Sequence, residues 1–456
     1  MERAPRADAA SPARHTQPAT VGDARDLDVD DLNYLMSSPE SNVFEYHPRY
    51  GVRSPAVGLL RFGYRMGATL LRERRSARPA SDSPEVLFAI ETLNQYEAVR
   101  PILAHVERHL VLGLLEPFER PFPEGSAHLR SLRYLPALLR RARDPRGWSR
   151  EGFRRALHLY WLTYGYYLTA VRELQALRPR LVVVSNDHGM RPRTFARAAR
   201  DTGIPVAYVQ HASVTDKFPP LSFDISFLDG MDAAEKYAAV GTTSGKAYLV
   251  GIAKADAVRQ RRRPKGPIRR LGVCVNLVDP LPQVVRTLRE VAAALPEVEV
   301  LLRPHPSDSR PWRSSVAVEV SDGRAERSFE FLGRVDAIVS GPSNIILEAA
   351  LARVPAIFLD FAGRGGDGYG FVDAGLCPVA TDAADVRNLV LGLGALRPSL
   401  ERALRRFHAT SGSAYDGRSA ELVGALIGSF LTGGGEPVRW RRVPGFGSFE
   451  VLELEG

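Results

Sequence analysis

The sequence predicts an α/β protein with two doubly wound, Rossmann-like parallel sheets that face each other across a cleft, with helical additions at the N-terminus. The prediction rests on two series of short apolar runs that alternate with helical segments, one before residue 256 and one after residue 271. Strands that are buried on both faces have such continuous apolar runs. Between the two series lies a charged segment with Pro and Gly, 257–270, which is interpreted as an interdomain linker.

The first series defines an N-terminal domain over 84–256. Apolar runs predict strands at 84–90, 109–114, 181–185, 204–210, 223–230 and 247–251. The long helical region 128–178 carries aromatic residues on more than one face, which favours a helix that is buried on most sides.

Two further segments precede this domain. Residues 1–30 have the composition of a disordered tail, and residues 31–83 form a helical extension. The extension contains an amphipathic stretch, 54–75, that either packs on its own domain or lies on a membrane surface.

The second series defines a C-terminal domain over 271–432 that binds the nucleotide donor. Its strands are predicted at 271–276, 298–302, 316–320, 336–340, 355–360 and 377–380. Residues 433–456, which are rich in Gly and basic side chains, are expected to be a flexible tail.

Composition limits the classes of function. The chain has 456 residues, 45% of them hydrophobic and 25% charged, which is typical of a globular protein with more than one core. The net charge of +9 suits a phosphate-bearing ligand or an anionic membrane surface. The arginines are scattered and form no recognised nucleic-acid-binding module, so we expect no nucleic-acid partner.

Cysteine usage and hydropathy indicate the compartment. Cys274 and Cys377 have neither the number nor the spacing of a disulfide framework or a metal site. No segment has the roughly 18–20 uninterrupted apolar residues that a spanning helix needs. We therefore expect a cytoplasmic protein, soluble or peripheral at the inner face of the membrane.

The stretch LLRPHPSD, 301–308, follows an apolar strand with a cation and an imidazole. Arg303 and His305 each precede a proline, which holds them in extended conformations. Arginine binds phosphate with a planar fork, and a rigidly held imidazole can donate a proton to a leaving phosphate. Both residues are therefore candidate donor-phosphate ligands.

A second polar turn opens the helix that follows strand 336–340. The candidate residues in this turn are Ser340, Gly341, Ser343 and Asn344. The start of a helix offers unpaired N–H groups to an anion. Glu348, near the start of the same helix, is placed to accept hydrogen bonds from ribose hydroxyls. The alternative is a capped turn with an ordinary surface glutamate.

The His-Pro after one strand, the serine turn after another, and the later helix and PAIFLD strand resemble the donor domain of GT-B type bacterial transferases. The similarity is to polysialyltransferase-like and CDP-glycerol glycerophosphotransferase-like enzymes of capsule and teichoic-acid synthesis, over about residues 180–430. It implies that His305, Ser340 and Ser343 hold the phosphate of a CMP- or CDP-linked donor, with Glu348 on the ribose. It also implies a glycan or lipid-linked acceptor in cell-surface polysaccharide synthesis.

The N-terminal domain offers residues for the acceptor side. Asp187 and His188 follow strand 181–185, and His211 follows strand 204–210. Transfer to a hydroxyl needs a base, and a carboxylate or a neutral imidazole can serve. His211 resembles the histidine of the His-Gly pair in the glycerophosphotransferases, with Ala212 in place of the glycine. His211 is expected to be essential, Asp187 is the better base for a sugar hydroxyl, and His188 is a base or an ordinary loop histidine.

Three amides complete the expected acceptor site, namely Asn94, Gln95 and Gln210. The sequence has no phosphate-binding P-loop and no HExxH motif. We expect no bound metal and no cofactor besides the donor substrate, because a fixed cation and a helix end can stabilise a leaving phosphate.

The hypothesis is thus a metal-independent glycosyltransferase that moves a sugar or polyol phosphate from a nucleotide to an acceptor. Two alternatives remain open: an enzyme like the nucleotide-sugar 2-epimerases, and a non-catalytic relative that binds a nucleotide or polysaccharide.

Overall fold

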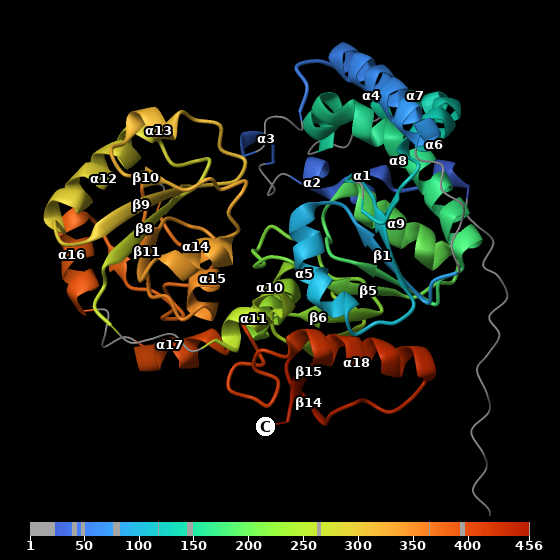
Figure 1. The fold of residues 1–456 in the computed structure, drawn as a ribbon. Helices are drawn as coiled ribbons and strands as arrows, with labels where there is room; N and C mark the ends of the chain where they lie inside the picture. Colours follow the sequence, from blue (N-terminus) through green and yellow to red (C-terminus); the bar gives the residue numbers. More distant parts are fainter. Residues whose placement is uncertain are drawn as a thin grey trace, which may run out of the picture.

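Two parallel sheets, each covered by helices on both faces, form two domains that lie side by side (Figure 1). This computed structural model describes residues 23–455 apart from 39–42, 47–50, 76–82, 117, 144–148, 262–265, 364 and 393–396. Among the described helices, none combines the length and apolar character that a bilayer-spanning segment requires.

The N-terminal domain contains a nine-stranded sheet of order β14-β15-β7-β6-β5-β4-β1-β2-β3. The strands along the first series are β1 (Val86–Ile90), β2 (His109–Gly113), β3 (Arg120–Pro121), β4 (Leu181–Val184), β5 (Val206–Val209), β6 (Ile225–Leu228) and β7 (Lys246–Leu249). Neighbouring strands from β3 to β15 are parallel, and only the end strand β14 runs antiparallel to its neighbour. The predicted strands of this domain are confirmed.

Helices cover both faces of this sheet. They are α1 (Val29–Leu32), α2 (Tyr34–Ser37), α3 (Val43–Tyr46), α4 (Pro55–Arg75), α5 (Leu93–Leu103), α6 (Glu124–Ser131), α7 (Leu135–Arg143), α8 (Ser149–Leu177), α9 (Met190–Asp201) and α10 (Met231–Val240), with short 3-10 turns η1 (Ala24–Asp26), η4 (Leu132–Tyr134) and η5 (Ala253–Ala255). The long helix α8 is buried on several sides, as expected, because Tyr160, Tyr166 and Tyr167 are all fully buried.

The C-terminal domain contains a six-stranded sheet of order β10-β9-β8-β11-β12-β13. Its strands are β8 (Arg270–Val275), β9 (Glu299–Pro304), β10 (Glu319–Val320), β11 (Ala337–Ser340), β12 (Ala356–Leu359) and β13 (Val379–Ala380). Its helices are α12 (Leu281–Ala294), α13 (Trp312–Ser315), α14 (Ser328–Arg334), α15 (Ile345–Leu351), α16 (Ala383–Gly392) and α17 (Arg397–Leu404). Separate apolar cores lie on the two faces of this sheet, which is the doubly wound arrangement.

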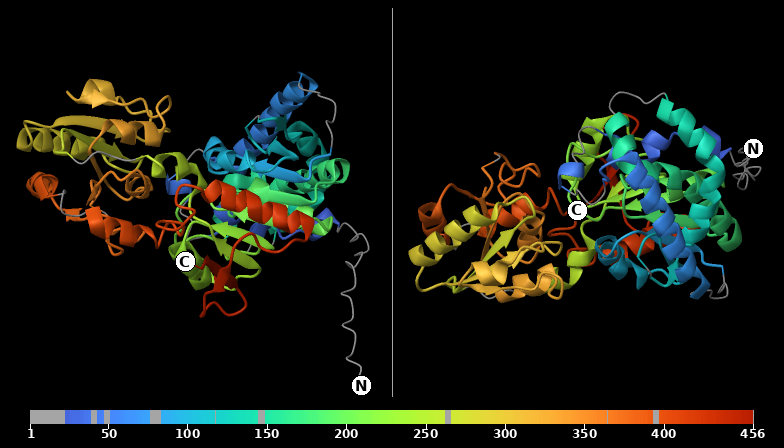
Figure 2. Two further views of the ribbon diagram at one scale, coloured as in Figure 1. Left: turned by 60° about the horizontal axis from the view of Figure 1, so that its bottom comes forward. Right: turned by 90° about the horizontal axis from the view of Figure 1, so that it is seen from above.

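The end of the chain returns to the N-terminal domain, contrary to the prediction of a flexible tail at 433–456. Helix α18 (Ser419–Thr432) lies along that domain (Figure 2), and β14 (Trp440–Arg442) and β15 (Glu450–Leu454) extend its sheet. Phe449 and Val451 are buried there, since β15 pairs with β7 and shields its edge. The C-terminal domain therefore ends before α18 and not at residue 432.

The N-terminal tail and the linker also differ from their predicted boundaries. Most of the predicted N-terminal tail, 1–22, lies outside the described residues, but η1 and α1 occupy part of 23–32 and bury Ala24 and Val29. The predicted linker begins with α11 (Asp256–Arg259), and its residues 262–265 lie outside the described part.

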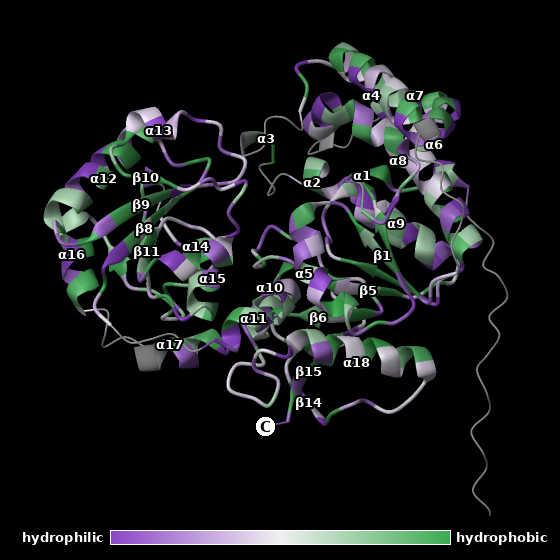
Figure 3. Ribbon diagram, viewed as in Figure 1, coloured by the Kyte–Doolittle hydropathy of each residue, from purple (hydrophilic) through white to green (hydrophobic). Residues whose placement is uncertain are grey.

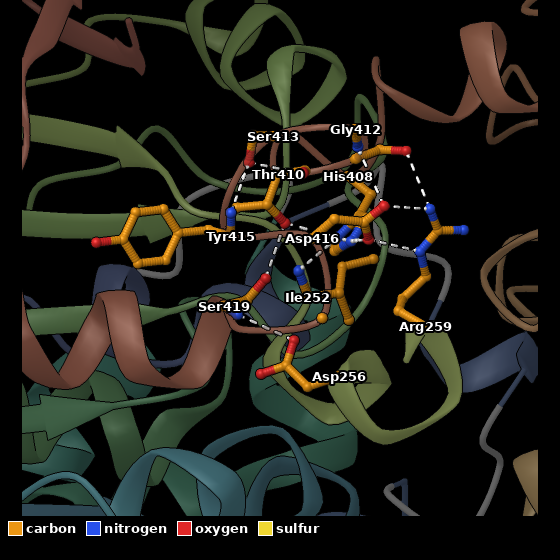
Figure 4. A network of polar contacts seen from close by, with 12 residues as sticks. Ile252, Asp256, Arg259, His408, Thr410, Gly412, Ser413, Tyr415, Asp416 and Ser419 are labelled. Atoms are coloured by element: carbon orange, nitrogen blue, oxygen red, sulfur yellow. Dashed lines mark hydrogen bonds and ion pairs between the residues drawn. The ribbon is translucent and has the colours of Figure 1, made fainter. Parts of the chain in front are cut away.

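The chain thus passes between the domains twice, and the two passages are bonded to each other (Figure 4). Arg259, in the first passage, donates to the carboxylate of Asp416, in the second, at 2.7 and 2.8 Å. The Asp256 carboxylate accepts the N–H groups of Ser419 and Ala420, at 3.0 and 2.8 Å, and so caps α18. This network holds both passages together between the domains.

Candidate functional site

The loops at the carboxyl ends of the two sheets meet between the domains. Ser213, in the loop after β5, donates a hydrogen bond of 2.5 Å to Oδ1 of Asn344, in the turn after β11. Nearby, Lys254 of η5 donates to Glu348 of α15 at 2.8 Å. The predicted acceptor loop and the predicted donor turn are therefore in direct contact.

The loop after β4 contains a buried carboxylate that holds an imidazole. Oδ1 of Asp187 lies 2.8 Å from Nδ1 of His188, and Oδ2 accepts the hydroxyl of Tyr237 at 2.7 Å. Burial by itself would raise the pKa of Asp187, but these two hydrogen bonds outweigh it and lower the pKa below its ordinary value. Asp187 is therefore a carboxylate at neutral pH.

This arrangement separates the roles of the two residues. Both oxygens of Asp187 are engaged, so this carboxylate is badly placed to take a proton from an acceptor. A carboxylate at Nδ1 fixes the proton on that nitrogen of His188 and leaves Nε2 as the basic atom. The side chain of His188 is 18% exposed, whereas that of Asp187 is 1% exposed. The geometry favours His188 as the base and Asp187 as its positioning residue.

His211 lies beside this pair, with its ring centroid 6.4 Å from that of His188. Burial, together with the nearby His188, lowers the pKa of His211 to about 3, so the ring is neutral at physiological pH. Its Nδ1 is buried and has no hydrogen-bond partner among the described residues. A neutral ring with an unpaired nitrogen suits hydrogen bonding to a ligand better than proton transfer.

Two of the three amides expected to bind the acceptor instead hold the backbone. Gln210 accepts the N–H of Asp229 at 2.9 Å and donates to the carbonyl of Ala212 at 2.9 Å. Gln95 is buried and accepts the N–H of Glu91 at 2.9 Å. Because these amide groups are already paired within the domain, both act on loop structure. Asn94 is exposed in the first turn of α5.

The two donor-side turns lie at one edge of the C-terminal sheet, as expected for ends of parallel strands. The register pairs Ser340 with Cys274 and Cys274 with Arg303, so the ends of β11 and β9 lie level on either side of β8. Asn276, after β8, donates to the carbonyl of Pro342 at 2.7 Å. Its own carbonyl accepts Arg310, from the His305 loop, at 2.7 Å. These bonds link the three loops.

The side chain of Arg303 does not face this edge of the sheet, in contrast to the prediction that it binds phosphate. It is still part of β9, and its guanidinium is buried against Ser321 at 3.1 Å and the carbonyl of Glu326 at 3.0 Å. The ring of Phe331 covers it at 5.1 Å. Alternate residues of a strand face opposite sides of the sheet, and Arg303 faces the helix α14. His305, two residues later, lies beyond the strand in a tight turn, where its Nδ1 accepts the N–H of Ser307 at 3.1 Å.

The turn of residues 340–344, here called the serine turn, places polar side chains at the end of β11. The hydroxyl of Ser340 is buried and has no hydrogen-bond partner among the described residues, and Gly341 follows it directly. Ser343 is partly exposed, and its hydroxyl accepts the N–H of Ile345 at 3.4 Å. Helix α15 has only seven residues, so its dipole adds little to anion binding.

Sequence reasoning missed Lys254, Ser213 and Asp229. Lys254 lies between Glu348 and Asp229, and burial raises the pKa of Asp229 well above its usual range although Lys254 opposes this effect. All three residues follow strands of the N-terminal sheet, so the rule that functional groups gather at strand ends would have found them.

Comparison with known proteins supports the fold. Neither a protein-family profile nor a curated protein matches the sequence. A structure from Listeria monocytogenes assigned as a UDP-N-acetylglucosamine 2-epimerase is 14% identical, with a TM-score of 0.50, and the match covers 78% of this chain and 98% of that chain. The chain has the GT-B fold, with two Rossmann-like parallel-sheet domains.

Two further solved structures are similar over comparable lengths. The UDP-GlcNAc 2-epimerase from Neisseria meningitidis, bound to UDP-GlcNAc, is 13% identical with a TM-score of 0.49, and the match covers 76% of this chain and 99% of that chain. MurG from Acinetobacter baumannii is 13% identical with a TM-score of 0.44, and the match covers 76% of this chain and 100% of that chain. At such identities, the likeness concerns the GT-B architecture alone.

Proposed function

We propose that the protein is a GT-B glycosyl- or polyol-phosphate transferase that uses a nucleotide-activated donor and an acceptor hydroxyl. The observation that carries the proposal is that the Asp187–His188 pair lies beside His211. The loop that contains His211 also contacts the serine turn of the other domain, through the Ser213–Asn344 hydrogen bond. In this proposal His188 is the base on one domain, and the turns of the other domain bind the donor phosphate.

The reaction assigns one step to each side of the cleft. Nε2 of His188 takes the proton of the acceptor hydroxyl while the hydroxyl oxygen bonds to the transferred group. The bond from that group to the nucleotide phosphate breaks, and its electrons leave with the nucleotide. His305 and the hydroxyls of Ser340 and Ser343 are assigned to the phosphate that leaves.

The resemblance to capsule and teichoic-acid enzymes suggests a CMP- or CDP-linked donor and a glycan or lipid-linked acceptor. In this proposal Glu348 exchanges its ion pair with Lys254 for the donor ribose, so donor binding and the contact between the domains are coupled.

Nucleotide binding is the first test. Thermal shift with CMP, CDP, UMP, UDP and GDP is measured on the wild type and on His305→Ala. One nucleotide is expected to raise the melting temperature of the wild type, and the variant is expected to lose the shift. His105→Ala, an exposed histidine on the other domain, is the control and should keep it. No shift with any nucleotide would count against the proposal.

Product analysis then separates the classes of function. A transferase releases nucleotide only when an acceptor is present, whereas an epimerase changes its substrate without an acceptor. A protein that only binds ligands does neither, and it would tolerate His188→Ala without loss of its cellular effect. The proposal requires that His188→Ala abolishes transfer while the nucleotide-induced shift remains.

A further inference from the structure

The outer face of α4 is apolar although it points to solvent. Val57, Leu60, Tyr64 and Leu71 are 44%, 74%, 78% and 59% exposed. Their spacing of three, four and seven residues places them along one side of the helix. Figure 3 shows hydrophobic segments along α4 at the top of the N-terminal domain. We refer to these four residues as the α4 stripe.

The opposite face of α4 is the one that packs on the domain. Phe62 is buried and stacks on Trp161 of α8 at 4.1 Å between ring centroids. The edge of His128 contacts the same Phe62 ring at 4.9 Å, and Met66 packs on the same core. The helix therefore has a complete set of core contacts without the α4 stripe, so the stripe is not needed to hold the helix in place.

The apolar surface continues on the neighbouring elements α6, η4 and α7. Leu129, Leu132, Leu135 and Leu139 are 47%, 43%, 38% and 51% exposed, again with a helical spacing. Leu138 between them is buried and anchors α7. Three consecutive helical elements thus present leucines to solvent, which is more than the scattered exposed leucines of an ordinary surface.

The charges that these helical elements carry are mostly positive, although Arg141 of α7 pairs with Asp30 of α1. Residues 55–75 and 124–143 contain ten arginines and two glutamates, with no lysine or aspartate. Both glutamates are used within the protein, since Glu124 is buried against Arg191 at 2.8 Å and Glu73 accepts the N–H of Ser126 at 3.0 Å. Exposed arginines such as Arg72 and Arg140 accompany the leucines. The surface is therefore apolar and cationic.

We propose that the α4 stripe, with the leucines of α6–α7, docks this protein on a bilayer that contains anionic lipids. Apolar side chains enter the acyl boundary, and the arginines pair with lipid phosphates. A second copy of the chain fits less well, because two such faces would bring exposed arginines such as Arg72 and Arg140 against each other. Docking places the N-terminal domain, which carries the proposed acceptor side, next to the membrane.

Vesicle sedimentation tests this inference without any substrate, so its failure would leave the transferase proposal untouched. The full-length protein is mixed with vesicles of phosphatidylcholine alone or with phosphatidylglycerol added. We expect binding to the anionic vesicles, and we expect it to weaken with salt. Leu60→Asp with Tyr64→Asp should weaken binding by at least about tenfold, since two inserted side chains are lost. Leu391→Asp is the matched control, because Leu391 is 69% exposed but lies on α16 of the other domain.

Three results would overturn the inference. The first is a wild type that does not bind anionic vesicles at low salt. The second is a Leu60→Asp, Tyr64→Asp protein that binds as tightly as the wild type. The third is a wild-type dimer, measured by light scattering without lipid, that this double variant converts to monomers, which would assign the α4 stripe to a second copy of the chain. Circular dichroism of the variant, compared with Leu391→Asp, shows whether the fold is kept.

Discussion

Replacing Asp187 by asparagine tests the division of roles between a base and its positioning residue. The carboxylate accepts from Nδ1 of His188 at 2.8 Å and from the hydroxyl of Tyr237 at 2.7 Å. An amide has one acceptor oxygen, so Asp187→Asn satisfies only one of these partners. If the oxygen stays with Tyr237, the amide N–H faces His188, forces the proton onto Nε2 and removes the basic atom from the cleft.

The size of the effect follows from the loss of the correctly oriented base. We expect kcat for transfer to fall by roughly 10²–10⁴-fold, or about 3–5.5 kcal/mol of barrier, with KM for the donor nearly unchanged. The assay is release of the nucleotide identified by thermal shift, followed at saturating acceptor. Tyr237→Phe is the control: it keeps the His188 contact and removes two hydrogen bonds, to Asp187 and to the Tyr208 hydroxyl, each worth about 0.5–1.5 kcal/mol of stability, so the rate should fall by less than about tenfold. An Asp187→Asn enzyme that retains a third or more of wild-type kcat would refute this division of roles.

Three other predictions concern stability, measured by urea unfolding. A double-mutant cycle with Lys254→Met and Glu348→Gln should give a coupling of about 1–3 kcal/mol, because the pair is mostly buried between the domains; additive effects would contradict this contact. Arg259→Met should cost about 1–3 kcal/mol, since it removes a buried guanidinium that donates hydrogen bonds to the partly exposed Asp416 carboxylate, and an unchanged midpoint would show that the two passages are held by other contacts. Burial, aided by nearby arginines, lowers the pKa of His158 to about 3, whereas the unfolded chain takes up this proton near pH 6.5. The free energy of unfolding should therefore fall as the pH drops from about 6.5 toward 3, by up to about 1.4 kcal/mol per pH unit. His158→Phe should flatten that slope, and an unchanged slope would contradict the assignment to His158.

Strand positions could be read from the sequence because strands covered on both faces have to be apolar throughout. The exception is 316–320, where β10 is reduced to Glu319–Val320 and helix α13 precedes it. This is an edge strand, which pairs with β9 alone. An edge strand places fewer demands on its sequence, so its extent is set by contacts elsewhere in the domain.

The packing of residues 433–456 on the N-terminal domain could not be predicted in the same way. Residues 433–456 contain Gly, Pro and basic residues, which locally favour an irregular segment. Pairing of β15 with β7 joins residues about two hundred positions apart, and no local pattern encodes it. Composition therefore predicted a flexible segment, whereas tertiary contacts determine the structure of these residues.

For the candidate site residues, the sequence predicted the loops but not the orientations of the side chains. The rule for strand ends selected the loops of His188, His211 and Ser343, and the structure brings the last two of these loops into contact. It could not tell which side chain in a loop faces the cleft, and this is why Arg303 and Gln210 turned out to be engaged within their own domains. Proline on either side of His305 indicated a stiff backbone, but the orientation of Arg303 depended on its register in β9.

A chain that crosses from one domain to the other and back restricts how those bodies can move. The two covalent tethers are bonded to each other by Arg259 and Asp416, so the domains are attached at one place. Pulling the domains apart would stretch both tethers, whereas a rotation about their shared attachment would stretch them least. Relative motion of the domains is therefore expected to pivot at this joint.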